Sequence, residues 1–158
     1  GRKLALGGAM VLLLFIAMVG HRRTIIAGGW YRVLDHQVVS GLDYIRTLDD
    51  KDGIAVASEA VRGHNFGWWI EGYAHIPTYT VTAQYLLFQA ERQQGAVAQT
   101  IISPDTPPED VRSVAEAENI RFVFLDRETV TIPAPNLVKA GFEVTFENDR
   151  VVVMEPTW

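Results

Sequence analysis

The sequence predicts an α/β fold: a small three-layer domain with a mixed sheet ending in a β-hairpin, preceded by one transmembrane helix. Three observations predict this fold. Residues 4–20 carry no charge and are mostly apolar, which is typical of a membrane-spanning helix. Over residues 35–140, short apolar runs alternate with stretches of helical periodicity. The chain then closes with two alternating segments around Asn148 and Asp149, the pattern of a hairpin.

The uncharged N-terminal run is long enough to cross a bilayer. It has 17 residues, and at about 1.5 Å per residue its helix spans roughly 25 Å. A hydrocarbon core is nearer ~30 Å thick, so the run sits at the short end of the spanning range. Basic side chains on both flanks extend its reach by snorkelling to the headgroups: Arg2, Lys3, Arg22 and Arg23. We therefore expect residues 1–23 to form a transmembrane helix with basic flanks, seated in a lipid bilayer.

Three other interpretations of this run compete with a spanning helix. A cleavable signal peptide would end at a small-x-small cleavage site, whereas this run ends in His21-Arg22-Arg23. A buried core helix usually keeps a polar stripe and an interfacial helix a charged face, and the run has neither. Because the chain starts at Gly1 rather than methionine, we expect this helix to be the last one of a larger polytopic protein. Basic residues at both ends leave its orientation undecided.

A juxtamembrane linker over residues 24–34 joins this helix to a soluble α/β domain over residues 35–158. Two placements stay open for Trp30 and Tyr31 in the linker: at the level of the headgroups, or packed on the domain. The domain begins with an amphipathic helix over residues 35–48, whose apolar residues recur at helical spacing: Val38, Val39, Leu42, Ile45 and Leu48. A polar turn then leads to an apolar run at residues 54–58, which predicts a buried strand.

The middle of the chain predicts mainly helices. Three glycines among the aromatic residues of 62–73 indicate a loop that runs into a short helix. Residues 82–102 predict a long helix, which ends at Ser103 because Pro104 disfavours a helical conformation in its predecessor. The next helix is predicted to have Thr106 as its cap and Pro107 at its first position. Glu109 completes a capping box, and the helix ends near Asn119.

The C-terminal part predicts the rest of the sheet. Residues 120–126 are a second strand, and residues 135–140 are a short helix stopped by Gly141. The alternating segments 142–147 and 150–155 predict two strands joined by a two-residue turn, Asn148-Asp149. After the first helix, the order is therefore β-α-α-β-α-β-β, which predicts a three-layer domain around a mixed sheet.

Charge and composition exclude several classes of function. All 19 acidic residues follow Arg23, against 10 of the 14 basic ones, so the chain beyond Arg23 has a net charge of −9. It also lacks the Lys and Arg clusters that phosphate contacts need, which excludes nucleic acid as a partner. The absence of cysteine excludes disulfides and thiolate chemistry. We predict no metal site, since His64, Glu71 and His75 lack the spacing of a helical metal-binding motif.

The candidate binding site is a cluster of aromatic and polar residues after the first predicted strand. Carboxyl ends of strands are where open α/β sheets place ligands. Sugar sites combine aromatic rings that pack on sugar rings with carboxylates and amides that bind hydroxyls. Two adjacent tryptophans also commonly pack in a core or an interface, so both interpretations stay open. The residues predicted to bind substrate are His64, Asn65, Trp68, Trp69, Glu71 and Tyr79, with His75 nearby.

Several segments together resemble a known family. They are Gly67-Trp68-Trp69-Ile70-Glu71-Gly72, Pro77-Thr78-Tyr79, the helix with Glu91-Arg92, the strand Ile120-Arg121-Phe122-Val123-Phe124, and the closing Phe146-Glu147-Asn148-Asp149-Arg150-Val151-Val152-Val153. This set resembles the C-terminal extracytoplasmic domain of polytopic GT-C-type membrane glycosyltransferases and their uncharacterised relatives. The resemblance covers most of the chain after residue 35.

The resemblance implies an accessory role in sugar transfer from a lipid-linked donor, in a cell membrane and outside the cytoplasm. It implies a parent protein that uses a polyprenyl-phosphate-linked sugar and a divalent metal, and whose transmembrane part is this domain's partner. The family's catalytic acids lie in early extracytoplasmic loops, which this chain lacks, so no catalytic residue is assigned. Oligosaccharyltransferases carry a Trp-Trp-Asp motif that contacts the acceptor peptide. Here Ile70 follows Trp68-Trp69, so that role does not carry over.

A second function stays open beside this one: a membrane-tethered, non-catalytic binding or interaction module. The sequence upstream of Gly1 would discriminate between the two. Further hydrophobic spans, with an acidic pair in the first outward loop, would favour the glycosyltransferase. A start codon or a signal sequence immediately upstream would favour the tethered module.

Overall fold

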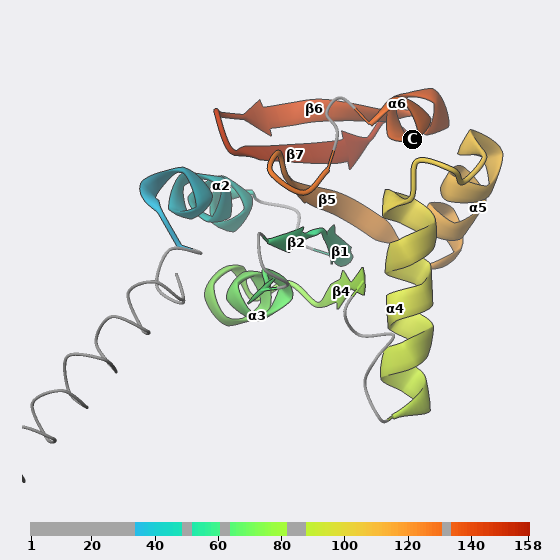
Figure 1. Ribbon diagram of the computed structural model, residues 1–158, viewed down its shortest axis with the longest axis horizontal. Helices are drawn as coiled ribbons and strands as arrows, with labels where there is room; N and C mark the ends of the chain where they lie inside the picture. Colours follow the sequence, from blue (N-terminus) through green and yellow to red (C-terminus); the bar gives the residue numbers. More distant parts are fainter. Residues whose placement is uncertain (1–33, 49–51, 61–63, 82–87, 131–133) are drawn as a thin grey trace, which may run out of the picture. The chain divides into compact units, whose positions relative to one another are not determined.

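The computed structural model describes residues 34–48, 52–60, 64–81, 88–130 and 134–158 (Figure 1). The chain divides into two compact units, residues 1–33 and 34–158, and the fold below is that of the second. The predicted transmembrane helix and all but the last residue of the linker lie outside the described residues, as do Arg2, Lys3, Arg22, Arg23, Trp30 and Tyr31. Among the residues that are described, no helix has the length and apolar character needed to cross a membrane.

The centre of the domain is a five-stranded mixed sheet with the strand order β4-β1-β5-β7-β6. β1 (Ile54–Ala57) pairs in parallel with both β4 (Thr78–Thr80) and β5 (Ile120–Asp126). β7 (Val151–Pro156) runs antiparallel to β5 and to β6 (Phe142–Glu147). The predicted mixed sheet and its closing hairpin are therefore confirmed.

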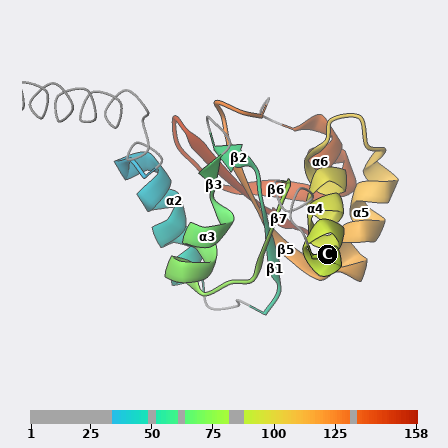
Figure 2. The same cartoon turned by 60° about the horizontal axis from the view of Figure 1, so that its bottom comes forward.

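Helices cover both faces of this sheet, which gives the three predicted layers (Figure 2). One face carries α2 (His36–Thr47), α3 (Gly67–Trp69) and the π-helical turn η1 (Ile70–Ala74). The other face carries α4 (Gln89–Ile102), α5 (Pro108–Ala117) and α6 (Pro135–Ala140). Because neighbouring side chains of a strand point to opposite faces, β5 contributes to both helical layers.

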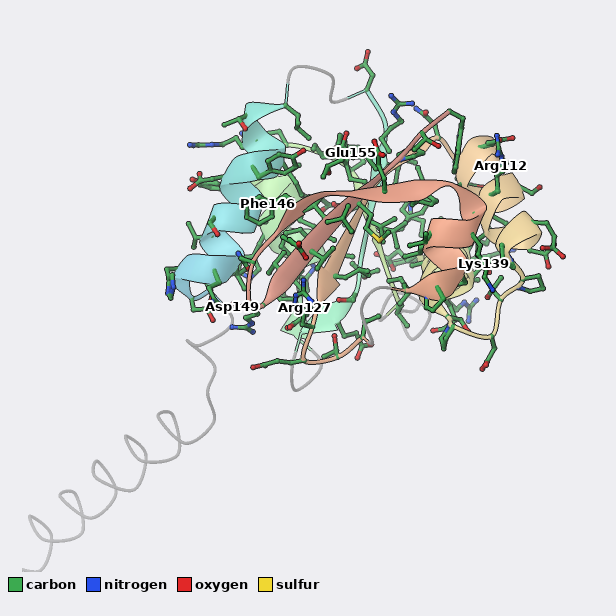
Figure 3. All side chains as sticks on the ribbon, turned by 90° about the horizontal axis from the view of Figure 1, so that it is seen from above. Arg112, Arg127, Lys139, Phe146, Asp149 and Glu155 are labelled. Carbon is green, nitrogen blue, oxygen red and sulfur yellow. The ribbon has the colours of Figure 1, made fainter. Side chains whose placement is uncertain are left out.

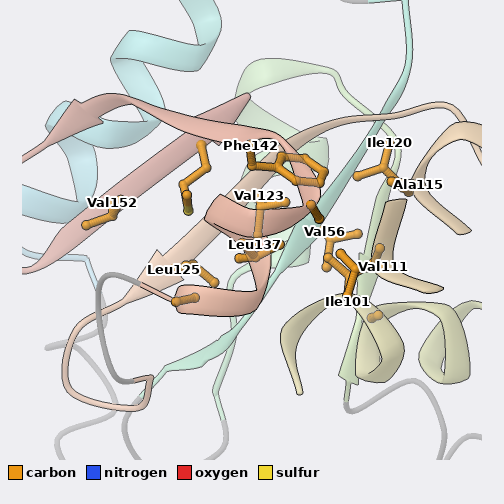
Figure 4. Close-up of a cluster of buried hydrophobic side chains, with 14 residues drawn as sticks. Val56, Ile101, Val111, Ala115, Ile120, Val123, Leu125, Leu137, Phe142 and Val152 are labelled. Carbon is orange, nitrogen blue, oxygen red and sulfur yellow. The ribbon is translucent and has the colours of Figure 1, made fainter. Parts of the chain in front are cut away.

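One core cluster lies between the sheet and helices α4, α5 and α6 (Figure 4). Val56, Val123 and Leu125 from the strands pack there, in one buried cluster with Ile101 of α4 and Val111 of α5. On the opposite face, the ring of Phe124 in β5 contacts the ring of Phe66, with centroids 5.4 Å apart. The runs predicted to be buried strands are thus buried on both faces, as expected for strands between two helical layers.

Helix α2 packs very closely on the sheet. The Asp35 carboxylate caps its first turn by accepting hydrogen bonds from the backbone N–H groups of Gln37 and Val38. A Cβ atom at Gly41 would lie 2.9 Å from Val151 Cγ1 and 3.1 Å from Phe124 Cε2. The absence of a side chain at Gly41 therefore sets the distance between helix and sheet. Val39 differs from the prediction: it lies on the outer side of α2 and is 37% exposed.

Two predicted helices differ from the structure near their starts. The helix predicted over residues 82–102 is not continuous, because Phe88 has an extended backbone and α4 begins at Gln89; residues 82–87 lie outside the described chain. α5 begins at Pro108, and neither a Thr106 cap nor a capping box forms. The reason is that Pro108 restricts the residue before it to an extended conformation, so Pro107 stays outside the helix with ψ 140°. α5 also ends at Ala117, before the predicted Asn119, which has a positive φ of 53°.

The hairpin departs from the prediction at its turn. β7 begins at Val151, so Asn148, Asp149 and Arg150 connect the strands instead of the two residues Asn148-Asp149. The side-chain oxygen of Asn148 accepts hydrogen bonds from the N–H groups of Arg150, at 2.9 Å, and Val151, at 2.7 Å. This side chain therefore shapes the longer turn by satisfying backbone donors that a regular ladder would have paired.

A register shift in β6 between Val144 and Phe146 redirects its aromatic residues. Phe142 joins the core beside α6, whereas Phe146 stacks on Tyr44 of α2 with ring centroids 5.1 Å apart. Figure 3 shows Phe146 on the side of the strand nearer α2. Strict alternation would put Phe142 and Phe146 on the same face. The irregularity at Thr145 thus lets one strand contribute to both helical layers.

Candidate functional site

The segment after β1 forms a two-stranded ribbon that was not predicted. β2 (Glu59–Ala60) pairs antiparallel with β3 (His64–Asn65). Ser58 fixes its start: its hydroxyl oxygen accepts a hydrogen bond from the N–H of Asp126 at 2.8 Å. The hydroxyl of Thr129 donates to the carbonyl of Glu59 at 2.6 Å. The ribbon is therefore tied to the carboxyl ends of β1 and β5, where the sequence predicted a ligand crevice.

Beyond the ribbon, α3 and η1 present three aromatic side chains to solvent. Trp68 is 76% exposed, Trp69 is 44% exposed and Tyr73 is 37% exposed. Phe66 and Ile70 in the same segment are completely buried, because they lie on the side that packs on the sheet. The predicted short helix is thus amphipathic, with its largest aromatic rings outward. We call Trp68, Trp69 and Tyr73 the aromatic surface.

Tyr73 is held in place by two charged residues of α2. Its hydroxyl donates a hydrogen bond to Asp43 Oδ1 at 2.7 Å, and the guanidinium of Arg46 lies 4.7 Å from the ring centroid. Arg46 also forms an ion pair with Asp43 at 3.2 Å. The hydrogen bond to Asp43 raises the pKa of Tyr73, which keeps its hydroxyl protonated as a donor. Sequence reasoning missed this arrangement, although the i, i+3 spacing of Asp43 and Arg46 is a helical ion-pair signal.

Glu71 has a local role that connects η1 to the sheet. Its Oε1 accepts a hydrogen bond from the N–H of Thr78, the first residue of β4, at 3.0 Å. Between them, His75 ends the π-helical turn with φ 59°, and its side chain is exposed. One carboxylate oxygen of Glu71 thus fixes the short connection from η1 to β4.

Tyr79 lies on the opposite face of the sheet from α3. It pairs with Val56 in the β1–β4 register and packs against the core cluster beneath α4 and α5. Its hydroxyl donates to Glu118 Oε2 at 3.4 Å, and burial together with the Glu118 charge raises the pKa of Tyr79. The structure therefore does not bring Tyr79 together with Trp68 and Trp69. His64 and Asn65 form β3, and their side chains lie outside the described part.

A second cluster, which sequence reasoning did not find, joins the hairpin turn to the start of α2. The Arg150 guanidinium contacts Asp35 at 2.5 Å and the fully buried Asp126 at 3.5 Å. Figure 3 shows Asp149, in the same turn, close to the N-terminal end of α2. Burial alone would raise the pKa of Asp35, but the Val38 N–H bond and Arg150 outweigh it and hold that pKa below 3.8. We interpret this cluster as structural, because its charges pair with one another.

The described residues offer no metal centre but include a shallow hollow. No group of three or more His, Asp or Glu side chains is close enough there to hold a metal ion. A shallow hollow of about 520 Å³ lies between the end of α4 and the start of α5. Its lining combines polar and apolar groups: Thr100, Ser103, Asp105, Thr106, Pro107, Asp110, Ser113 and Val114.

Comparison with known proteins shows a likeness in fold. No family model matches this chain, and no curated protein matches it in sequence. Among solved structures, it is similar to the C-terminal globular domain of an oligosaccharyltransferase from Archaeoglobus fulgidus. The TM-score is 0.54 and the sequence identity 15%, over 78% of this chain and 99% of that domain. The predicted resemblance is therefore supported at the level of the α/β fold.

Proposed function

We propose that residues 34–158 are the accessory, extracytoplasmic domain of a membrane glycosyltransferase that takes its sugar from a polyprenyl-phosphate-linked donor. The likeness to an oligosaccharyltransferase's C-terminal globular domain carries this proposal, because this chain covers 99% of that domain. The uncharged run at residues 4–20 supports it, since it provides the attachment that such a domain needs. The domain alone is non-catalytic, and the catalytic acids belong to the early extracytoplasmic loops of the parent protein.

The aromatic surface is the part of the domain that we assign to the side where the parent protein binds its lipid-linked donor. Indole rings provide flat apolar faces with a polar edge, which suits both sugar rings and headgroups. Trp68 and Trp69 are the exposed residues that meet this requirement, whereas Glu71 positions η1 through its bond to Thr78. We assign no step of the reaction here to the parent's divalent metal, because the described residues do not group three suitable ligands.

The proposal is tested with Trp68→Ala and Trp69→Ala, combined in the full-length parent protein. Sugar transfer from the lipid-linked donor is measured in isolated membranes at matched protein levels. We expect at least a tenfold loss of transfer, since the domain would no longer shape the cleft for donor or acceptor. Phe88→Ala is the matched control, because Phe88 is an exposed aromatic residue at the start of α4, on the other face of the sheet. Equal sugar transfer by the double tryptophan variant, the Phe88→Ala control and the unmodified full-length protein would contradict the proposal.

A further inference from the structure

We propose that the aromatic surface is seated in the phospholipid headgroup layer of the membrane, so that its partner is the lipid surface itself. This inference rests on the proposed function and names the partner of that same surface. Tryptophan and tyrosine are enriched at the membrane–water interface, where an apolar ring and a polar edge are both accommodated. Trp68, Trp69 and Tyr73 offer three such rings on two consecutive turns.

The exposed apolar side chains of the described residues are unevenly distributed. Four of the seven large ones lie on the face that carries α2, α3 and η1: Val39, Trp68, Trp69 and Tyr73. The other three are dispersed, with Phe88 before α4, Val138 on α6 and Val144 on β6. An exposure of 76% is high for a tryptophan, which is usually well buried. Burial of this face would therefore remove more exposed large apolar side chains from water than burial of the other face of the sheet.

Two charged residues of α2 beside the aromatic surface, Asp43 and Arg46, suit a headgroup layer. Asp43 and Arg46 neutralise each other, and both also contact Tyr73, so the rim carries no net charge from this pair. Pairing reduces the cost of bringing charged groups toward a medium of low dielectric constant. The Arg46 guanidinium also has donors that match a lipid phosphate.

The length of the preceding chain brings this face within reach of a membrane. Residues 21–35, 15 in all, separate the end of the uncharged run from the first residue of α2. Even when fully extended, such a segment spans at most about 50 Å. α2 packs directly on η1, since Asp43 and Arg46 both contact Tyr73. A bilayer anchor at residues 4–20 would thus keep the whole domain within reach of lipid, and the exposure of Trp68 and Trp69 is what favours this face.

The test uses the intrinsic fluorescence of the full chain in phosphatidylcholine vesicles that contain no lipid-linked sugar. The chain has four tryptophans, so Trp30→Phe with Trp158→Phe leaves Trp68 and Trp69 as the only tryptophan emitters, which are excited selectively at wavelengths that tyrosine does not absorb. The vesicles contain phosphatidylcholine brominated near the headgroup end of its acyl chains. We expect at least a twofold loss of Trp68 and Trp69 emission relative to vesicles without bromine, together with a shift to shorter wavelength.

The matched control keeps only Trp158, by changing Trp30, Trp68 and Trp69 to Phe. Trp158 packs edge-on against Phe142 with centroids 5.2 Å apart, and Arg112 covers its ring. We expect bromine to leave its emission unchanged. Equal quenching of both variants would mean non-specific adsorption and would overturn the inference. A blue shift without bromine quenching would indicate a protein partner and would also overturn it.

Flotation of the vesicles separates this inference from the proposed function. If the chain floats with the vesicles and Trp68 and Trp69 are not quenched, the inference fails alone, and the transfer assay still decides the function. If the chain does not float, the membrane attachment on which both depend is wrong.

Discussion

Arg150 connects three parts of the chain that are far apart in sequence. It reaches Asp35 before α2 and Asp126 at the end of β5, from its own position in the hairpin turn. Asp126 is fully buried, and its Oδ1 also accepts a hydrogen bond from the N–H of Glu128 at 3.0 Å. A buried carboxylate is tolerated only where a counter-charge and hydrogen bonds surround it.

Replacement of Arg150 by methionine should therefore destabilise the domain strongly. We expect the free energy of unfolding to fall by about 3–5 kcal/mol, because the Asp126 carboxylate would stay buried without its counter-charge. Urea unfolding of residues 34–158 measures this loss. Arg127→Met is the control: Arg127 pairs with the exposed Glu147 at 2.7 Å and donates to the Asn148 carbonyl at 2.9 Å, contacts that contribute about 0–1 and about 1 kcal/mol. Similar losses in both variants would show that Arg150 stabilises nothing beyond an ordinary surface contact.

Asp35 makes the same junction sensitive to acid. Because its pKa in the folded state lies below 3.8, its charged form stabilises the fold above that pH. This contribution is lost as the pH falls from about 4 through the lower folded-state pKa. Asp35→Asn keeps a side chain that can cap α2 but removes the charge. We expect the unfolding free energy of Asp35→Asn to fall less than that of the unmodified domain between about pH 5 and pH 3, as measured by urea titrations. Equal falls in the two proteins would contradict this prediction.

At the scale of elements, the contact between α2 and the sheet depends on Gly41. An added Cβ would meet Val151 and Phe124 at distances shorter than van der Waals contact allows. In an exposed helix, Gly→Ala stabilises by up to about 1 kcal/mol. At Gly41 we expect the opposite sign, with a loss of about 1–3 kcal/mol from overpacking.

Thermal unfolding of Gly41→Ala and Gly72→Ala checks this prediction. Gly72 lies in η1, and a Cβ there would meet nothing within 4 Å. We expect the melting temperature of Gly72→Ala to stay level or rise, while that of Gly41→Ala falls. A rise for both variants would show that α2 can move away from the sheet at little cost.

The elements differ in how far their sequences determined them. The strands at residues 120–126 and 142–147 and the helix at 135–140 matched the prediction, since local periodicity and Gly141 define them. The start of α5 did not, because the restriction imposed by Pro108 on Pro107 overrode the capping pattern. The irregularity at Thr145 was hidden as well: Phe142, Val144 and Phe146 alternate perfectly in sequence, and only packing against α2 separates Phe146.

The candidate site was predicted less completely than the fold, for a physical reason. Composition identified Trp68 and Trp69, but their exposure depends on which side of α3 meets the sheet. Tyr79 was placed with them because it is near in sequence, whereas strand alternation in β4 turns it to the opposite layer. The Asp43–Tyr73 contact joins residues 30 positions apart, which no local pattern encodes.

At the scale of the whole molecule, residues 34–158 form a compact unit with its own core. We therefore expect residues 34–158 to fold without residues 1–33. Circular dichroism should show one cooperative thermal transition, with the same midpoint in the far and near ultraviolet. A broad transition, or midpoints that differ between the two regions, would show that the unit depends on the missing segment.

The junction at Arg150 also has a mechanical consequence. Any tension on the chain ahead of Leu34 enters the domain at Asp35, which Arg150 holds against the hairpin turn. Asn148 adds a second hold through its hydrogen bonds to the Gln37 carbonyl and the Ser40 hydroxyl, at 2.8 and 3.0 Å. The tension is thereby transmitted through the hairpin turn to β7 in the middle layer, and α2 does not bear it alone. The first helix would therefore stay docked on the sheet when the preceding chain is pulled.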